Sequence, residues 1–521
     1  MKYSSLEQTK RSIPVVGILL LVCGKERRMA TPVVENLDIN IAHVQELLQD
    51  CMDIVQQEIY LRAGRVFLVY GETTISNVLL DQSVIAELLH QLDTLSVEEQ
   101  RILLTKKGIT AGKSKQFATI EEALCVLFTG DILLFAEGSP VAISVADKGY
   151  PGKPVGNCEA EKVIRGSSEG FCDSIKANEA LVRKRLRSAG FKIVEKKTGV
   201  RSETTIAFLY MEELARPEFL QKLQAGIDAY VIDGVFDSGT LEQLIKKDWA
   251  SPFPQFQTTQ RPDRAAQEIL QGRVVLLCDN SPTALMLPAG FSDFLRVSED
   301  RYNHFEIVSF ARLIRYSAML AALYISAFYL AVVSFHTQIL PTPLLLSLAE
   351  SRSGVPFPPM IEVLLMELSF EMIREAGVRM PGPLSGTIGI VGGLIIGDAA
   401  VSANLVSPMS VIVVAFGALC TFAVPDEEFG SALRLVRFMM LFLGGFLGLS
   451  GIVCGSFWLL LHLSGLTSFG IPYLEIMHRH TFHAQDSLYQ KPMTGLKNRP
   501  YYVNDKQSIR LRKVDKEDTE V

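Results

Sequence analysis

A carboxylate stands in a strongly apolar part of the chain, within the stretch IIGDAAVSANLVSP at residues 395–408. A charge at the centre of a bilayer costs about 2.5–3.5 kcal/mol on insertion scales, so Asp398 is expected to face protein or water. Asp398 and Ser402 share a helical face at four-residue spacing. Two interpretations stay open, a polar stripe that lines an ion pore and a polar contact between helices or subunits. The residues of this hypothetical site are Asp398, Ser402, Asn404 and Ser407.

A second group of carboxylates lies at helical spacing within residues 359–376. Glu367, Glu371 and Glu375 recur every four residues among Ile, Leu and Met, and therefore share one helical face. This pattern predicts an amphipathic helix at the membrane interface rather than a spanning helix. Its acidic face is either solvated or, if several copies assemble, forms an acidic ring at the mouth of a pore.

One basic segment, LVRKRLRS at residues 181–188, offers three neighbouring charges, Arg183, Lys184 and Arg185. Such a helix is suited to contact with anionic lipid headgroups or with the acidic face of a partner. A solvated surface helix is the alternative interpretation.

Catalytic and metal-binding patterns are not found in the sequence. It has no GxSxG, HExxH or phosphate-loop motif, its eight cysteines form no CxxC pair, and His90, His304 and His336 are isolated. We therefore expect neither an enzyme nor a bound cofactor or metal, and we expect free thiols in a reducing compartment. The net charge of −6, without a basic patch interleaved with aromatics, gives no reason to expect a nucleic-acid partner.

The elements that position these residues fall into two classes, because charged residues crowd the chain before residue 315 and after residue 478. The expected fold class is α+β, a cytoplasmic α/β region of two related subdomains followed by an all-α membrane domain. The expected divisions are an N-terminal extension of open role at residues 1–28, subdomain 1 at 29–148, subdomain 2 at 149–310, a transmembrane domain at 311–477 with the amphipathic helix near 359–376, and a basic cytoplasmic tail at 478–521.

Four spans are expected, and five are possible, from the long apolar runs at residues 313–335, 384–404, 405–424 and 435–463. The last run is either one long tilted helix or two short helices, with GGFLGLSG as the candidate break. Arg312, Arg315 and the basic tail favour a cytoplasmic location for the segments that precede and follow the transmembrane domain. The acidic loop PDEEFG is then expected on the opposite side of the membrane.

The α/β region contains an internal echo. GDILLFAEGSPVAISVA at residues 130–146 matches GRVVLLCDNSPTALMLP at residues 272–288 in register, and each stretch follows a predicted helix. We interpret the pattern as helix, strand, tight turn and strand, used twice in two related subdomains. A coincidence of hairpin chemistry is the alternative.

Several longer stretches resemble the A subunits of the GerA family of spore germinant receptors, over about residues 37–475. The stretches are EKVIRGSSEGFCDSIKANEALVRKRLRS, IDGVFDSGTLEQLI, SPFPQFQTTQRPD, FARLIR, LLLSLAESRSGVPFP and FGIPYLE. Departures from the family pattern, such as KPVGNCE near residue 155 and RGSSEGF, affect the assignment of the subfamily and the identity of the ligand rather than the family itself. An accessory paralogue of the stage V AF type therefore remains an alternative to a receptor subunit.

The resemblance implies a multi-pass protein of the endospore inner membrane, with its N-terminal domain and C-terminal tail facing the cytoplasm, which is the spore core. The implied partners are a B subunit that resembles amino-acid transporters, a lipoprotein C subunit and further copies of the chain, surrounded by membrane lipids. The implied role is an oligomeric, ion-conducting part of the receptor that opens when a nutrient binds. A non-conducting membrane scaffold is the rival interpretation.

Overall fold

The computed structural model describes residues 31–61, 64–72, 114–146, 161, 163–379, 397–474, 489–495 and 499. Two compact units divide the chain, Met1–Gly152 with Arg187–Ala189 and Lys153–Leu186 with Gly190–Val521. The extension at residues 1–28, residues 384–396 of an expected span, His90, and residues 478–488, 496–498 and 500–521 of the basic tail lie outside the described residues.

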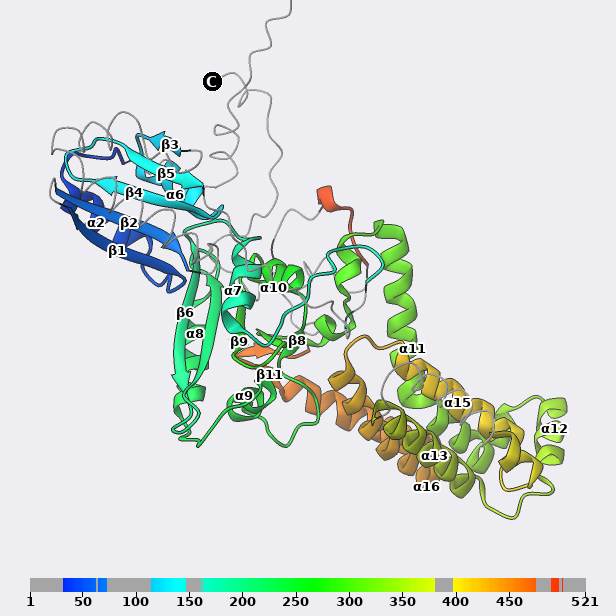
Figure 1. Cartoon of the computed structure of the whole chain (residues 1–521). Helices are drawn as coiled ribbons and strands as arrows, with labels where there is room; N and C mark the ends of the chain where they lie inside the picture. Colours follow the sequence, from blue (N-terminus) through cyan, green and yellow to red (C-terminus); the bar gives the residue numbers. More distant parts are fainter. Residues whose placement is uncertain are drawn as a thin grey trace, which may run out of the picture. The chain divides into compact units, whose positions relative to one another are not determined.

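The first unit is built on a five-stranded antiparallel sheet in the order β1-β2-β4-β5-β3 (Figure 1). The core strand β4 is buried along its whole length, and α2 and α6 contribute buried Leu, Ile and Val side chains to the same core. The elements of this unit are α2 (Leu37–Leu47), β1 (Ile54–Leu61), β2 (Gly64–Gly71), β3 (Ser114–Phe117), α6 (Ile120–Leu127), β4 (Asp131–Ala136) and β5 (Ala142–Ala146).

The α/β part of the second unit repeats this strand order as β6-β7-β9-β10-β8. The helices α7 and α10 share one buried cluster with the sheet, and α8 and α9 share another. The elements are α7 (Ile175–Arg183), β6 (Phe191–Thr198), β7 (Thr204–Met211), α8 (Pro217–Asp228), α9 (Ser238–Ile245), β8 (Gln257–Thr259), α10 (Pro262–Ile269), β9 (Val274–Cys278), β10 (Ala284–Leu287) and the 3₁₀ helices η3 (Phe291–Leu295) and η4 (Ser298–Arg301).

The sequence echo corresponds to equivalent hairpins, β4–β5 in the first sheet and β9–β10 in the second. Gly130 and Gly272 both have positive φ angles, 94° and 98°, between the preceding helix and the strand. Gly138 and Asn280 occupy the matching turn positions with φ of 77° and 65°. Glycine and asparagine tolerate this left-handed conformation, so the shared turn chemistry has a backbone cause.

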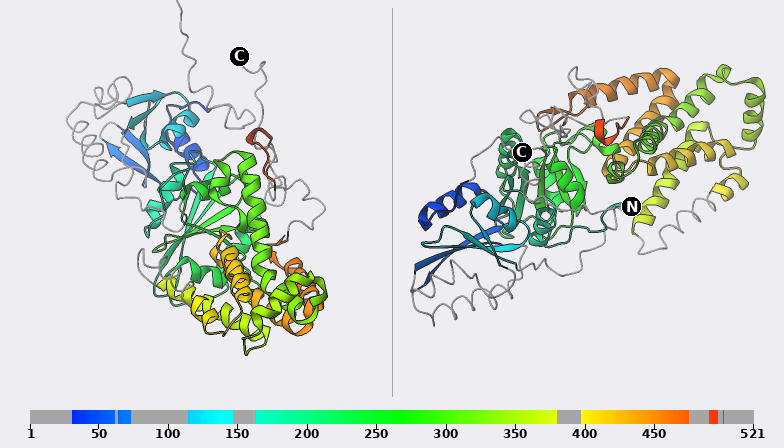
Figure 2. Two further views of the ribbon diagram at one scale, coloured as in Figure 1. Left: turned by 90° about the vertical axis from the view of Figure 1, so that its right-hand side faces the viewer. Right: turned by 90° about the horizontal axis from the view of Figure 1, so that it is seen from above.

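The rest of the second unit is a bundle of apolar helices in which α11, α13, α15 and α16 pack on one another (Figures 1 and 2). Among the described residues, α11 and α16 are long and apolar enough to cross a membrane. The elements are α11 (Phe305–Phe335), η5 (Thr337–Ile339), α12 (Thr342–Arg352), α13 (Pro359–Arg379), α15 (Pro408–Phe422), α16 (Glu427–Gly465), β11 (Thr467–Ser468), β12 (Ile471–Pro472) and η8 (Met493–Gly495).

The helix α16 folds back on itself at Gly448, whose φ of 64° and ψ of −145° are not helical. Phe429 and His462 would lie about 50 Å apart in a straight helix, yet the rings of both lie within 6.2 Å of the Phe253 ring, centroid to centroid. Close packing of the two arms depends on glycine, because a Cβ on Gly451 would meet the Leu443 carbonyl oxygen at 2.1 Å. The break in GGFLGLSG therefore forms a helical hairpin with arms of about 21 and 17 residues, or about 31 and 26 Å.

The hairpin overturns one expectation from the sequence. Residues 425–430 were expected on the side opposite the α/β region, but Phe429 packs against Phe253, Phe291 and Phe294 of that region. The acidic residues favour an exterior loop by charge alone, whereas Asp426 caps the first arm by accepting a hydrogen bond from the Phe429 N–H at 2.9 Å. Both arms therefore end at the α/β subdomain.

Candidate functional site

The bundle holds a buried ion pair between two of its helices. Arg437 of α16 lies 2.9 Å from Glu367 of α13, and Ser326 of α11 donates a hydrogen bond to the same carboxylate at 2.7 Å. All three side chains are buried. Losing one partner of such a pair leaves an uncompensated charge and costs about 3–5 kcal/mol. Together with Ser326, the ion pair therefore links three helices and selects one arrangement of them.

A second buried carboxylate, Glu362 of α13, gathers polar groups from two neighbouring helices. Arg352 of α12 lies 3.1 Å from one carboxylate oxygen. The other oxygen accepts from the Ser407 N–H at 3.1 Å and from the Ser410 hydroxyl at 2.9 Å. Glu362 thus lies at the N-terminus of α15, where the helix dipole favours a negative charge. Ser407 is the N-cap of α15, and its hydroxyl accepts from the Ser410 N–H.

The acidic face predicted on this helix meets three different environments. Glu367 is buried against Arg437, whereas Glu371 is partly buried and paired with Arg374 and with Arg434, the latter at 3.3 Å. Glu375 is exposed at the surface of the chain. In one chain the face is therefore largely an inter-helix contact, and the pore-mouth role of these residues stays a prediction.

The residues of the polar stripe that begins at Asp398 also lie in different environments. Residues 397–402 are helical, and Asp398, Ser402 and Asn404 are exposed in the single chain. Asn404 ends the segment with a positive φ of 51°, a conformation that asparagine tolerates. Ser407 is buried and is bound to Glu362. Three of the four predicted residues therefore form an exposed polar surface, and the fourth belongs to the buried network.

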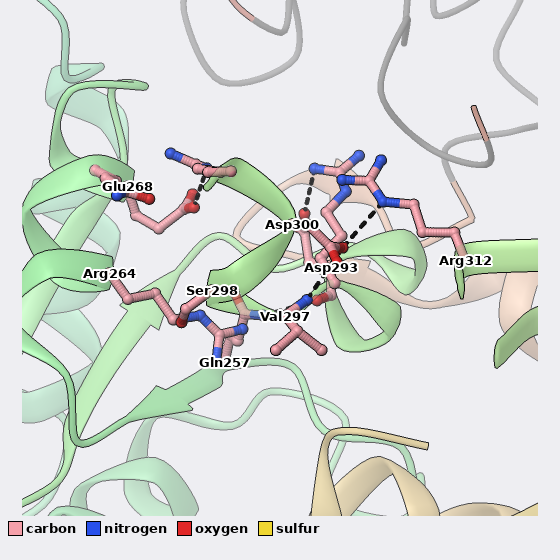
Figure 3. Close-up of a pocket in the computed structure, with 11 residues that line it drawn as sticks. Gln257, Arg264, Glu268, Asp293, Val297, Ser298, Asp300 and Arg312 are labelled. Atoms are coloured by element: carbon pink, nitrogen blue, oxygen red, sulfur yellow. Dashed lines mark hydrogen bonds and ion pairs between the residues drawn. The ribbon is translucent and has the colours of Figure 1, made fainter. Parts of the chain in front are cut away.

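The base of α11 is fixed to the α/β subdomain by a carboxylate. Asp300 of η4 accepts from Arg312 Nε at 3.0 Å (Figure 3). It also accepts from Arg315 Nη2 at 2.6 Å. Burial raises the pKa of Asp300, but hydrogen bonds from Arg315 and Arg312 outweigh it and hold the pKa below its ordinary value. Both arginines, predicted as the positive flank of a span, are therefore structural ligands of Asp300.

A neighbouring carboxylate, Asp293 of η3, extends this network. Its oxygens lie 2.5 Å from Arg273 Nη2 and 3.1 Å from Arg296 Nη1. Burial raises the pKa of Asp293, and the charges of Arg273 and Arg296 outweigh it, so the pKa is lowered. Asp293 and Asp300 both border a polar pocket (Figure 3). Its charged lining residues are Arg264, Glu268, Asp293, Arg296, Asp300, Arg301 and Arg312.

Aromatic side chains complete the junction between the subdomain and the bundle. The Phe294 and Phe429 rings stack at 5.4 Å with 8° between their planes, and Tyr473 lies 5.9 Å from Phe294. Phe253 contacts both Phe429 and Tyr473. The stretches SPFPQFQTTQRPD and FGIPYLE, which carry part of the family resemblance, supply Phe253 and Tyr473. Their separation in sequence hid the fact that they meet here.

The basic segment of α7 does not present all of its charges at the surface. Arg183 is buried, donates to the Phe191 carbonyl at 2.8 Å and lies 4.4 Å from the centroid of the Phe191 ring. Lys184 and Arg185 both pair with Glu169. Arg183 therefore departs from the surface role expected of it, while contact of Lys184 and Arg185 with lipid or a partner stays a prediction.

Asp293, Asp300 and Glu362 were not predicted as site residues. The only sequence sign was the pair Arg312 and Arg315, whose charges need partners when the helix base is buried. Among the residues that the structure describes, no group of three or more His, Cys, Asp or Glu side chains is placed to hold a metal ion.

The fold and these contacts define a mixed α/β protein that carries a bundle of long apolar helices tied together by buried ion pairs. The chain belongs to the Bacillus/Clostridium GerA spore germination protein family, whose sequence profile matches residues 42–502.

Relatives are similar over most of their length. The chain is 36% identical over 463 residues to the uncharacterized membrane protein YfkQ of Bacillus subtilis (strain 168), covering 88% of this chain and 89% of that protein. It is 34% identical over 475 residues to spore germination protein A1 of the same organism, with coverage of 90% and 96%. Spore germination protein XA of Bacillus anthracis is 31% identical over 448 residues, with coverage of 86% and 91%.

A solved structure also matches part of the chain. The crystal structure of the N-terminal domain of the A subunit of the Bacillus megaterium spore germinant receptor GerK3 aligns with 51% of this chain and 99% of its own, at 23% identity and a TM-score of 0.38.

Proposed function

We propose that this chain is the membrane-embedded A subunit of a spore germinant receptor, and that several copies line an ion-conducting pore that opens when a nutrient binds the complex. The observation that carries the pore is the exposed polar stripe of Asp398, Ser402 and Asn404 at the surface of the helix bundle. A carboxylate in that position avoids the cost of meeting lipid only when it faces protein or water.

The pairing of the other charges supports this choice of stripe. Glu362 and Glu367 are each paired with an arginine inside the chain, so their charges are already compensated. Asp398 lies outside this set and on the surface of the single chain. When copies assemble around an axis, an exposed stripe of Asp, Ser and Asn becomes the polar lining that a cation pathway needs.

The proposed setting is the inner membrane of the endospore, with the α/β subdomains and the basic tail facing the spore core. The base of α11 and both ends of the α16 hairpin meet the same α/β subdomain, which supports placing these three helix ends on one side of the membrane. The proposed partners are a B subunit that resembles amino-acid transporters, a lipoprotein C subunit and further copies of this chain.

A non-conducting scaffold is the second candidate, and the buried network favours it. Ion pairs such as Glu367 with Arg437 hold helices together without any passage of ions. In that case the exposed stripe would be a contact surface for a partner helix, and no ion flux would depend on the charge of Asp398.

The test compares Asp398→Asn with Glu350→Gln in spores, because Glu350 is an exposed carboxylate of α12 outside both the stripe and the predicted pore-mouth face. Asp398→Asn is expected to change the rate or selectivity of monovalent cation release after nutrient addition, while complex assembly, measured by co-purification of the partner subunits, persists. Glu350→Gln is expected to leave ion selectivity unchanged. Normal cation release in an assembled Asp398→Asn complex would remove the stripe from the pore and favour the scaffold.

A further inference from the structure

The loop that follows α9 carries a large aromatic ring that the protein does not cover. Trp249 is 85% exposed. The loop itself is well held, because Lys246 Nζ donates to the Ser251 carbonyl at 3.0 Å and the Ser251 N–H donates to the Asp248 carbonyl at 3.1 Å. A ring of this size held outward on an ordered loop indicates a contact surface outside the chain.

The same loop is fastened to the end of the returning arm of α16. The Ser251 hydroxyl and His462 Nε2 lie 2.9 Å apart, and His462 occupies the last turn of that arm. One turn earlier, Trp458 stacks on His462 at 5.6 Å with 8° between the ring planes. Trp249 and Trp458 are the two tryptophans of the chain, and both lie at this one end of the arm.

The outer face of the arm is apolar up to this level. Phe457, Trp458, Leu460 and Leu461 are between 46% and 64% exposed. Beyond His462 the helix ends at Gly465, and the loop adds Lys247, which is exposed, beside Trp249. The order along the arm is therefore an apolar face, a half-exposed indole, and then an indole with a lysine. Tryptophan and lysine in this order mark the boundary between hydrocarbon and headgroups.

We propose that the loop Lys246–Trp249 lies in the phospholipid headgroup layer, with the Trp249 ring at the interface and Lys247 near lipid phosphates. The α/β subdomain would then touch the membrane surface directly, beside the lipid-facing side of α16. The choice of lipid over a protein partner rests on the continuity of the loop with the exposed apolar face of the arm through Ser251 and His462. The inference rests on the membrane placement proposed above.

Because the chain has two tryptophans, single-tryptophan variants of the full chain report on each position. Trp458→Phe leaves Trp249 as the fluorophore after reconstitution into phosphatidylcholine and phosphatidylglycerol vesicles. Lipids brominated close to the glycerol end of the acyl chain are expected to quench Trp249 more strongly than lipids brominated near the chain terminus, and its emission is expected to shift to the blue on reconstitution.

Two results overturn the inference. Emission typical of water, quenched by iodide and not by brominated lipid, would place Trp249 in solvent. A blue-shifted emission that neither quencher reduces would place it under protein, either a second copy or a partner subunit.

Trp249→Phe serves as the control because it leaves Trp458 as the fluorophore. Quenching of Trp458 by brominated lipid without quenching of Trp249 rejects only the loop contact. Failure of brominated lipid to quench Trp458 contradicts the membrane placement of the α16 arm, and with it the proposed function.

Discussion

Replacing Asp300 by asparagine tests how firmly α11 is tied to the α/β subdomain. The wild-type carboxylate is buried and pairs with Arg312 and Arg315, and the asparagine removes its charge with little change in shape. Loss of one partner from a buried ion pair costs about 3–5 kcal/mol. Each arginine keeps another acceptor, the Gln490 Oε1 at 3.1 Å from Arg312 and the Leu295 carbonyl at 2.7 Å from Arg315.

The expected loss in the free energy of unfolding is therefore at the lower end, about 3 kcal/mol, or about 150-fold in the folding equilibrium. Denaturant titration of the detergent-solubilised protein measures it. The control is Asp233→Asn, because Asp233 is 83% exposed and lies 3.7 Å from an equally exposed Arg201. Exposed pairs contribute little, so the control is expected to change stability by less than about 1 kcal/mol. Equal stabilities of the two variants would refute the assignment of Asp300 as the residue that fixes α11 to the α/β subdomain.

Three further predictions concern other parts of the second unit. Folding lowers the pKa of Asp293, so this carboxylate contributes stability above its unfolded pKa of about 3.9. That contribution is lost as the pH falls through the lower folded pKa. Acid titration should therefore show a smaller loss of stability in Asp293→Asn than in the wild type. Gly451→Ala should destabilise or misfold the α16 hairpin, because the new Cβ would overlap the backbone at Leu443. Gly465→Ala should not, because the space around Gly465 is open. The readout is the thermal unfolding midpoint, and equal midpoints of the two variants would contradict the hairpin. Burial raises the pKa of Cys278 to about 12, so at pH 8 its thiol should resist maleimide while the exposed thiol of Cys125 is labelled. Rapid labelling of Cys278 in the folded protein, detected by mass spectrometry, would contradict its burial.

Local patterns predicted the parts of the fold whose cause is local. The echo between residues 130–146 and 272–288 was visible because Gly130, Gly272 and the Ser-Pro turns impose the same backbone on both hairpins. The break in GGFLGLSG was visible for the same reason, because glycine permits the positive φ at Gly448.

Contacts between distant segments could not be read from the sequence. Helical spacing placed Glu367 and Glu371 on one face but did not show that the face meets Arg437 and Arg434 of another helix. The acidic residues at 425–430 favour an exposed loop by charge alone, whereas a helix cap and an aromatic contact hold them against the α/β subdomain.

The central claim is that the stripe of Asp398, Ser402 and Asn404 faces the ion pathway of an assembled receptor. The most direct measurement is cation flux through the reconstituted complex carrying Ser402→Cys, in a background with the native cysteines replaced, before and after a positively charged methanethiosulfonate reagent. Ser464→Cys, exposed near the end of α16, is the matched control. Modification is expected to reduce cation flux at position 402 and to leave it unchanged at position 464. Unchanged flux through a complex shown by mass spectrometry to be modified at position 402 would contradict the central claim.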